Sequence, residues 1–201
     1  MTSPDSTQSR AELVRAEATG DLDAVRAGLG HPDPTLRCAA LGALDRTGQL
    51  DRQQLQAALS DKEATVRCRA IELAIGDTSI DLEVLLDDPD DLVVESAAWA
   101  LGERESDAVA AIGSLCRIAQ THEVSICREA AIAALGAIGS KDGLASILAG
   151  LDDRAEVRRR AVLALAPFDG PDVESALQRA LTDRDRQVRQ AAEDLLGSSL
   201  H

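Results

Sequence analysis

The residues whose spacing could support chemistry are arginines that return about every thirty positions, each a few residues after an acidic side chain. The arginines are Arg37, Arg67, Arg128, Arg158 and Arg189, and the acids are Asp33, Glu63, Asp90, Glu123, Asp153 and Asp185. Acids cap helix starts, and guanidinium groups form two-pronged pairs with carboxylates. We therefore interpret both rows as caps and links between repeats; the alternative is an arginine row that binds an anionic ligand. The run Arg158-Arg159-Arg160 is the one local basic cluster and a candidate contact for an anionic partner.

The four cysteines are Cys38, Cys68, Cys116 and Cys127. Cys38 and Cys68 hold the same position in adjacent repeats, but stacked helices lie about 8–10 Å apart and a disulfide needs Cα atoms within about 7 Å. Zinc-site spacing of the CxxC type is absent from the sequence. Cys127 takes a valine position, which predicts a core residue, and Cys116 could approach it across a helical hairpin. We expect no metal site here.

Trp99 is the only tryptophan. Its counterparts in the other repeats are Gly42, Glu72, Ala133, Leu163 and Asp194. This mixed set indicates a half-exposed position, where a tryptophan could anchor a partner. The alternative is that Trp99 fills the core of an irregular repeat.

The sequence shows no Ser-His-Asp arrangement, Gly-rich phosphate loop or Walker motif. We therefore predict that the chain is not an enzyme, with no catalytic residue and no cofactor. A net charge of −14 disfavours sequence-independent binding to nucleic acid, which needs a basic surface. No apolar run approaches the length of a membrane span, and the polar start, 1–10, lacks the apolar run of a signal peptide. We expect a cytoplasmic protein.

The elements that must position these residues are pairs of helices. The recurring motif reads Leu36-Arg37…Ala40…Leu44, Val66-Arg67…Ala70…Ala74, Val93-Val94…Ala97…Leu101, Cys127-Arg128…Ala131…Leu135, Val157-Arg158…Ala161…Leu165 and Val188-Arg189…Ala192…Leu196. First helices are predicted at 21–29, 51–59, 80–86, 106–119, 142–150 and 172–181. Second helices are predicted at 34–45, 63–75, 91–102, 123–138, 154–166 and 185–196. A short helix at 11–18, ended by Gly20, is expected to cap the array.

This pattern of acidic turn, Val-Arg-x-x-Ala, Leu and Gly over residues 21–196 resembles the HEAT-repeat superfamily, in particular the short repeats of phycobilisome lyases. In the third copy Val94 or Glu95 takes the arginine place. The resemblance implies an all-α, right-handed α-solenoid (superhelix) of about six helix pairs. One HEAT-repeat enzyme family, deoxyhypusine hydroxylase, binds di-iron through four His-Glu pairs. This chain has only His122-Glu123, which we interpret as part of a helix start.

Acidic residues outnumber basic ones 35 to 21, and only Lys62 and Lys141 are lysine. Such a balance is typical of proteins from salt-accumulating halophiles, where salt screens the self-repulsion; an ordinary acidic bacterial protein is the alternative.

The sequence thus predicts a disordered tail at 1–9 and a single repeat domain at 10–201. The predicted function is a non-enzymatic scaffold that binds another protein, neither nucleic acid nor membrane, in a regulatory or signalling assembly. The alternative is a phycobilisome-lyase-like or other HEAT-repeat enzyme or chaperone that acts on a bound cofactor. The candidate contact residues are Arg67, Glu72, Trp99, Arg128, Arg158 and Arg159.

Overall fold

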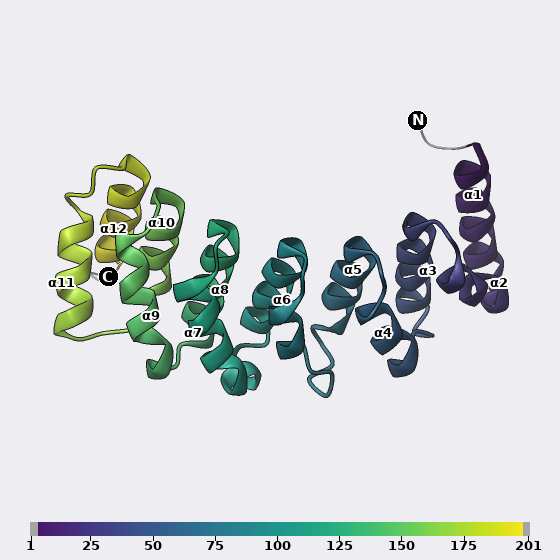
Figure 1. The fold of residues 1–201 in the computed structure, drawn as a ribbon, viewed down its shortest axis with the longest axis horizontal. Helices are drawn as coiled ribbons and strands as arrows, with labels where there is room; N and C mark the ends of the chain where they lie inside the picture. The colour runs from purple at the N-terminus through teal and green to yellow at the C-terminus, as the bar shows by residue number, and fades with distance from the viewer. Residues whose placement is uncertain (1–3, 199–201) are drawn as a thin grey trace. The chain divides into compact units, whose positions relative to one another are not determined.

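The computed structural model describes residues 4–198, and over this range the chain forms helices and no strand. Contacts divide it into two compact units, Met1–Ile80 and Asp81–His201. Each unit is built from successive helix pairs (Figure 1). The predicted all-α repeat architecture is therefore confirmed, while the single domain at 10–201 stays a prediction. None of the described helices has the length and apolar character needed to cross a bilayer.

The first unit holds a capping helix and two helix pairs. Its elements are α1 (Pro4–Thr19), α2 (Leu22–Ala27), the 3₁₀ segment η1 (Gly28–Gly30), α3 (Pro34–Arg46), α4 (Arg52–Leu59) and α5 (Ala64–Ala74). Helix α1 packs against α2 and α3, and α3 packs against α5. Because α1 begins at Pro4, residues 4–9 of the predicted disordered tail are helical. Proline suits a first helical position, where its missing N–H would have no partner. Residues 1–3 lie outside the described residues.

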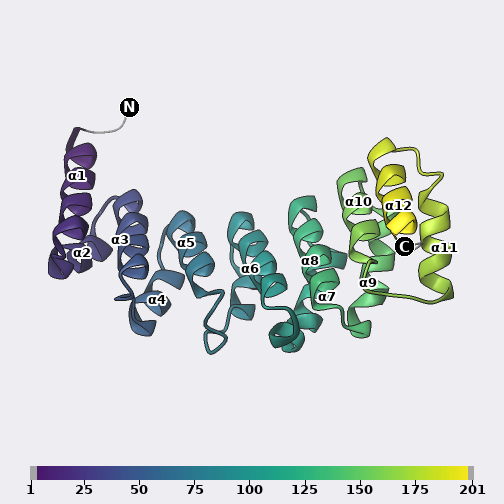
Figure 2. The ribbon, with the colours of Figure 1, turned by 180° about the vertical axis from the view of Figure 1, so that it is seen from behind.

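The second unit holds the remaining pairs. Its elements are η2 (Glu83–Asp87), α6 (Asp91–Glu103), η3 (Glu105–Ala111), α7 (Ile112–Thr121), α8 (Ser125–Ile138), η4 (Lys141–Gly143), α9 (Leu144–Ala149), η5 (Gly150–Asp152), α10 (Ala155–Ala164), α11 (Pro171–Ala180) and α12 (Arg186–Ser198). Helices α6, α8 and α10 lie side by side in both views, with α12 next to α10 (Figures 1 and 2).

The stack of second helices is held by small and branched side chains that recur at the motif positions. Ala97, Ala131 and Ala161 are fully buried, each one turn after a buried Val or Cys. Gly136 brings α8 against α10, since a Cβ there would lie 2.7 Å from the Cα of Ala164. Close helix approach therefore follows from the small residues of the motif.

The prediction of a first helix at 80–86 was wrong. The chain is irregular after Gly76 and then forms only the 3₁₀ segment η2. The Asp77 carboxylate accepts the Ser79 N–H at 3.1 Å, and the Asp81 carboxylate accepts the Glu83 N–H at 2.9 Å. Such local side-chain bonds compete with helical ones.

Candidate functional site

The arginines of the motif link neighbouring repeats. The Arg37 guanidinium forms a two-pronged pair with Asp61 of the next repeat, with Nε–Oδ2 at 2.8 Å and Nη2–Oδ1 at 2.6 Å. Its remaining nitrogen donates to the carbonyl oxygens of His31 and Pro32 in its own turn. One side chain thus fixes both its own turn and the turn between the two helices of the next repeat.

The same link recurs in the second unit. Arg128 pairs with Asp153 at 2.6 and 2.7 Å, and Arg158 pairs with Asp183 at 2.8 and 2.7 Å. The hydrogen bonds from Arg158 hold the pKa of the Asp183 carboxyl below its ordinary value. The predicted role of the arginines as links is therefore confirmed for these pairs, which we call the ladder together with Arg37–Asp61.

The acids of the turns divide into two roles. Asp33, Asp90 and Asp185 cap helix starts, each accepting a backbone N–H two residues later at 2.8 to 3.0 Å. The caps predicted at Glu63 and Glu123 were wrong, because neither α5 nor α8 has a side-chain cap at its start. Asp61 and Asp183 instead take the ladder arginines. The capping acids and Asp153 were predicted from the sequence, whereas Asp61 and Asp183 were missed, although both stand six residues before a motif arginine.

The ladder has no arginine in the third repeat. Val94 takes that place and is buried at 1% exposure, which settles the register of this copy, because Val93 then matches the buried valines. The residue six positions before Arg128 is His122, at the place where Asp61 and Asp183 take a ladder arginine and where the first repeat has His31. Arginine and acid are thus replaced together between the third and fourth repeats.

A groove of about 430 Å³ crosses α6, α8 and α10. Its floor is the alanine-rich surface of α8, and Trp99 of α6 and Ile126 of α8 stand beside it at 46% and 45% exposure. The other lining residues are Glu95, Gly102, Glu103, Glu129, Ala130, Ala133, Ala134, Ala137 and Arg160. The exposure of Trp99 shows that the core-filling alternative was wrong.

The groove is acidic. Glu95, Glu103 and Glu129 line it against one cation, Arg160, which pairs with Glu129 at 3.1 Å. Glu95 and Glu103 form no ion pair with any residue in the described range 4–198. Burial, together with the charge of Glu129, raises the pKa of the Glu95 carboxyl. A cation in the groove would therefore find two unpaired carboxylates.

Of the predicted contact residues, the groove contains only Trp99. Arg128 and Arg158 direct their donors into the ladder and to carbonyl oxygens, with Arg158 buried. Arg159 is half-buried on α10 and does not line the groove.

Arg67 and Glu72 belong to the first unit. Arg67 donates to the Asp61 carbonyl, and Glu72 pairs with Arg69 at 2.6 Å.

Sequence reasoning missed Ile126 and Glu95. Ile126 stands two residues before the motif arginine, where Thr35, Thr65, Glu156 and Gln187 are polar and the third repeat has the exposed Leu92. An apolar residue at a position that is mostly polar was the signal in the sequence that could have indicated Ile126 as a contact residue.

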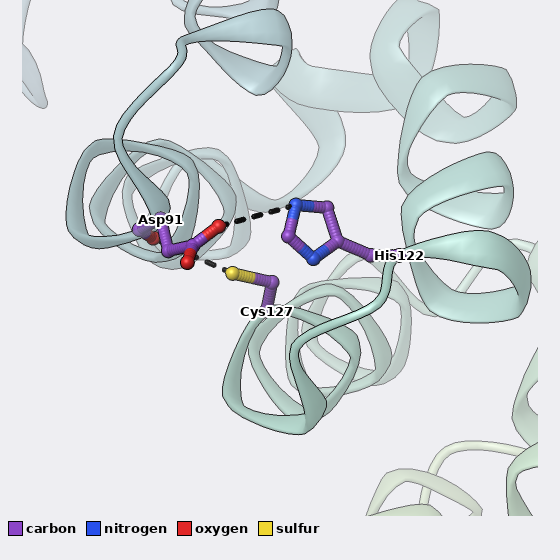
Figure 3. Close-up of side chains that lie close together, drawn as sticks. All are labelled: Asp91, His122 and Cys127. Carbon is purple, nitrogen blue, oxygen red and sulfur yellow. Dashed lines mark hydrogen bonds and ion pairs between the residues drawn. The ribbon is translucent and has the colours of Figure 1, made fainter.

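One group of metal-ligating side chains occurs among the residues that the structure describes. Asp91 at the start of α6, His122 before α8 and Cys127 within α8 offer ligand atoms that all lie within 4.8 Å of one another (Figure 3). The sequence analysis had placed Cys127 in the core, which its burial confirms, but had not connected it with His122.

Comparison with known proteins gives the family of the fold. The sequence model of HEAT repeats matches residues 78–166 and 142–199, more than half of the chain. No curated protein matches the sequence. A designed armadillo repeat protein in complex with the peptide (KR)4 has a similar structure, with 19% identity and a TM-score of 0.62 over 88% of this chain and 98% of that one. The complex of CpcE and CpcF of phycocyanin lyase from Nostoc sp. PCC7120 is also similar, with 23% identity and a TM-score of 0.58 over 88% of this chain and 76% of that one. At such identities the likeness shows the fold alone.

Proposed function

The chain belongs to the HEAT-repeat family, and we propose that it is a non-enzymatic scaffold whose groove binds a basic segment of a partner protein. The observation that carries the proposal is Trp99, a large aromatic side chain left 46% exposed beside a groove with unpaired carboxylates. Exposed tryptophan is costly in water and is favoured at the centre of protein interfaces.

The groove supplies three kinds of contact. The indole of Trp99 and the side chain of Ile126 offer apolar surface that a partner would remove from water. The alanine floor of α8 lets a partner backbone approach closely. Glu95 and Glu103 are free to pair with lysine or arginine, and a cation beside Glu95 would favour its charged form, which burial and Glu129 now disfavour.

The similar designed armadillo protein holds a peptide of alternating Lys and Arg, which agrees with this choice of partner. A place in a regulatory or signalling assembly belongs to the same proposal, because a scaffold acts through the proteins that it joins. The lyase-like alternative stays a hypothesis.

Selection from a displayed library of random peptides tests the proposal. We expect peptides enriched in Lys and Arg, and a change in the emission of the only tryptophan when a selected peptide is added. Trp99→Ala should weaken binding of that peptide at least about 30-fold, as expected for a hot-spot residue. The double variant Glu95→Gln/Glu103→Gln should weaken it and reduce its dependence on salt.

Val84→Ala is the matched control, because Val84 is an exposed apolar residue on η2 outside the groove. It should leave the affinity unchanged. Arg159→Glu tests the separate contact predicted at Arg159 in the same assay. The proposal fails if no basic peptides are enriched, or if the Trp99 and Val84 variants bind them equally well.

A further inference from the structure

Three departures from the repeat pattern meet at the junction of the third and fourth repeats. Asp91 stands where other repeats have Pro34, Ala64, Ser125, Ala155 and Arg186. His122 stands where Asp61 and Asp183 take a ladder arginine, a place that His31 holds in the first repeat, and Cys127 replaces a valine or leucine. These three positions lie in different parts of the sequence, yet their ligand atoms lie within 4.8 Å of one another.

The side chains already face one another (Figure 3). His122 Nε2 lies 3.8 Å from Oδ1 of Asp91, and Sγ of Cys127 lies 3.4 Å from the Asp91 carbonyl oxygen. Ligand atoms around a tetrahedral zinc ion are roughly 3.3–3.7 Å apart, given its bond lengths. The three donors therefore need to move by about 1 Å or less to surround one ion.

We propose that Asp91, His122 and Cys127 form a binding site for a divalent transition-metal ion, with zinc as the preferred ion. Thiolate, imidazole and carboxylate together suit zinc better than magnesium or calcium, which prefer oxygen ligands alone. Three protein ligands leave a fourth position for water. The open side is that of Asp91, whose side chain is 53% exposed, while Cys127 is fully buried.

Uptake of the ion replaces the proton of the Cys127 thiol. Burial and the nearby Asp91 and Glu95 raise the pKa of this thiol to about 11, so it carries its proton in the metal-free protein. Zinc bound to sulfur holds the thiolate form, and the thiol proton leaves to solvent.

The imidazole of His122 is oriented from its other nitrogen. In the metal-free protein Nδ1 accepts the Val124 N–H at 3.2 Å and Nε2 faces Asp91, but this bond is lost when Nε2 binds an ion. Coordination through Nε2 requires the ring proton on Nδ1, and the exposed Val124 N–H then bonds to water. His31 offers a comparison, because its Nδ1 accepts the Asp33 N–H at 3.0 Å in the same way. Among the described residues, however, His31 belongs to no group of three ligands.

The position of the site suggests that the ion would stabilise the contact between two repeats. Elsewhere in the second unit an Arg–Asp pair joins each second helix to the turn of the following repeat. Between α6 and α8 that pair is replaced by Val94 and His122. An ion held by Asp91 of one repeat and by His122 and Cys127 of the next would connect the same two elements.

Titration of the metal-free protein with zinc, in competition with a chromophoric chelator, tests the site. We expect one ion per chain, a higher melting temperature with zinc, and a thiolate-to-cobalt charge-transfer band with Co²⁺. Cys127→Val should abolish the band and weaken zinc binding at least about 100-fold, more than the loss of an outer-shell partner. Its fold should persist, since Val66, Val157 and Val188 hold this position elsewhere.

Asp91→Ala provides a second variant, at an exposed site where two repeats carry alanine. We expect it to weaken zinc binding at least about tenfold. His31→Asn and Cys116→Ser are the matched controls and should leave the affinity unchanged. The proposal is overturned if zinc does not bind stoichiometrically, if Cys127→Val and Asp91→Ala both retain wild-type affinity, or if the control variants lose as much.

Discussion

Removal of one carboxylate from the ladder should destabilise the second unit strongly. Asp183→Ala leaves the Arg158 guanidinium without its partner at a place where the arginine side chain is 6% exposed and the aspartate side chain 16% exposed. The carbonyl of Asp153 still accepts one N–H from Arg158 at 2.8 Å. The charge itself, however, remains buried and uncompensated.

The expected loss is about 3–5 kcal/mol in the free energy of unfolding, the range observed when one partner of a buried ion pair is removed. Asp87→Ala is the matched control. The Arg117–Asp87 pair has the same nitrogen–oxygen distance, 2.7 Å, as Arg158–Asp183, but its side chains are 47% and 71% exposed. Water and salt screen such a pair, so its loss should cost less than about 1 kcal/mol.

The pH dependence of stability provides a second test of the same pair. Because the hydrogen bonds from Arg158 lower the pKa of Asp183 in the folded state, the pair contributes fully above the pKa of the unfolded carboxyl. That contribution disappears as pH falls through the lower folded pKa. The difference in stability between wild type and Asp183→Ala should therefore be largest near neutral pH and should shrink below about pH 4.

Urea denaturation at neutral and acidic pH, followed by far-ultraviolet circular dichroism and by the emission of Trp99, measures both effects. Coincident transitions with the two probes justify a single free energy. Similar losses in the free energy of unfolding for Asp183→Ala and Asp87→Ala at neutral pH would refute this prediction, because burial would then not make one ion pair more important than the other. A difference that stayed constant down to acidic pH would show that the carboxylate charge is not what the ladder requires.

Two further predictions concern packing and charge. Gly136→Ala should destabilise the protein by about 1–3 kcal/mol, because the added Cβ would lie 2.7 Å from the Cα of Ala164. Gly113→Ala in α7, with nothing within 4 Å of its added Cβ, should instead stabilise it by about 0.5–1 kcal/mol; equal effects in urea denaturation would contradict this account. With a net charge of −14, the melting temperature should rise with added KCl up to molar concentrations, and an unchanged melt would argue against a salt-adapted composition.

The repeat pattern made most of the fold predictable. Each second helix was placed within two residues of its observed ends, because an acidic turn marks its start and buried residues recur along one face. The failure at 80–86 arose where Asp77 and Asp81 bind the backbone locally, an effect that hydrophobic spacing does not reveal. The groove was only partly predictable, because its acids come from different helices and their exposure depends on the stacking.

The junction of the third and fourth repeats is where the chain departs most from its own pattern. In a stack of repeats each unit contacts only its neighbours, so the shared motif encodes the packing of one unit on the next. Val94 and His122 remove a ladder link at this junction, and Trp99 and Ile126 place apolar surface in water beside it. A partner in the groove and an ion at the replaced link, as proposed above, would together account for the missing link, the exposed tryptophan and the three clustered metal ligands.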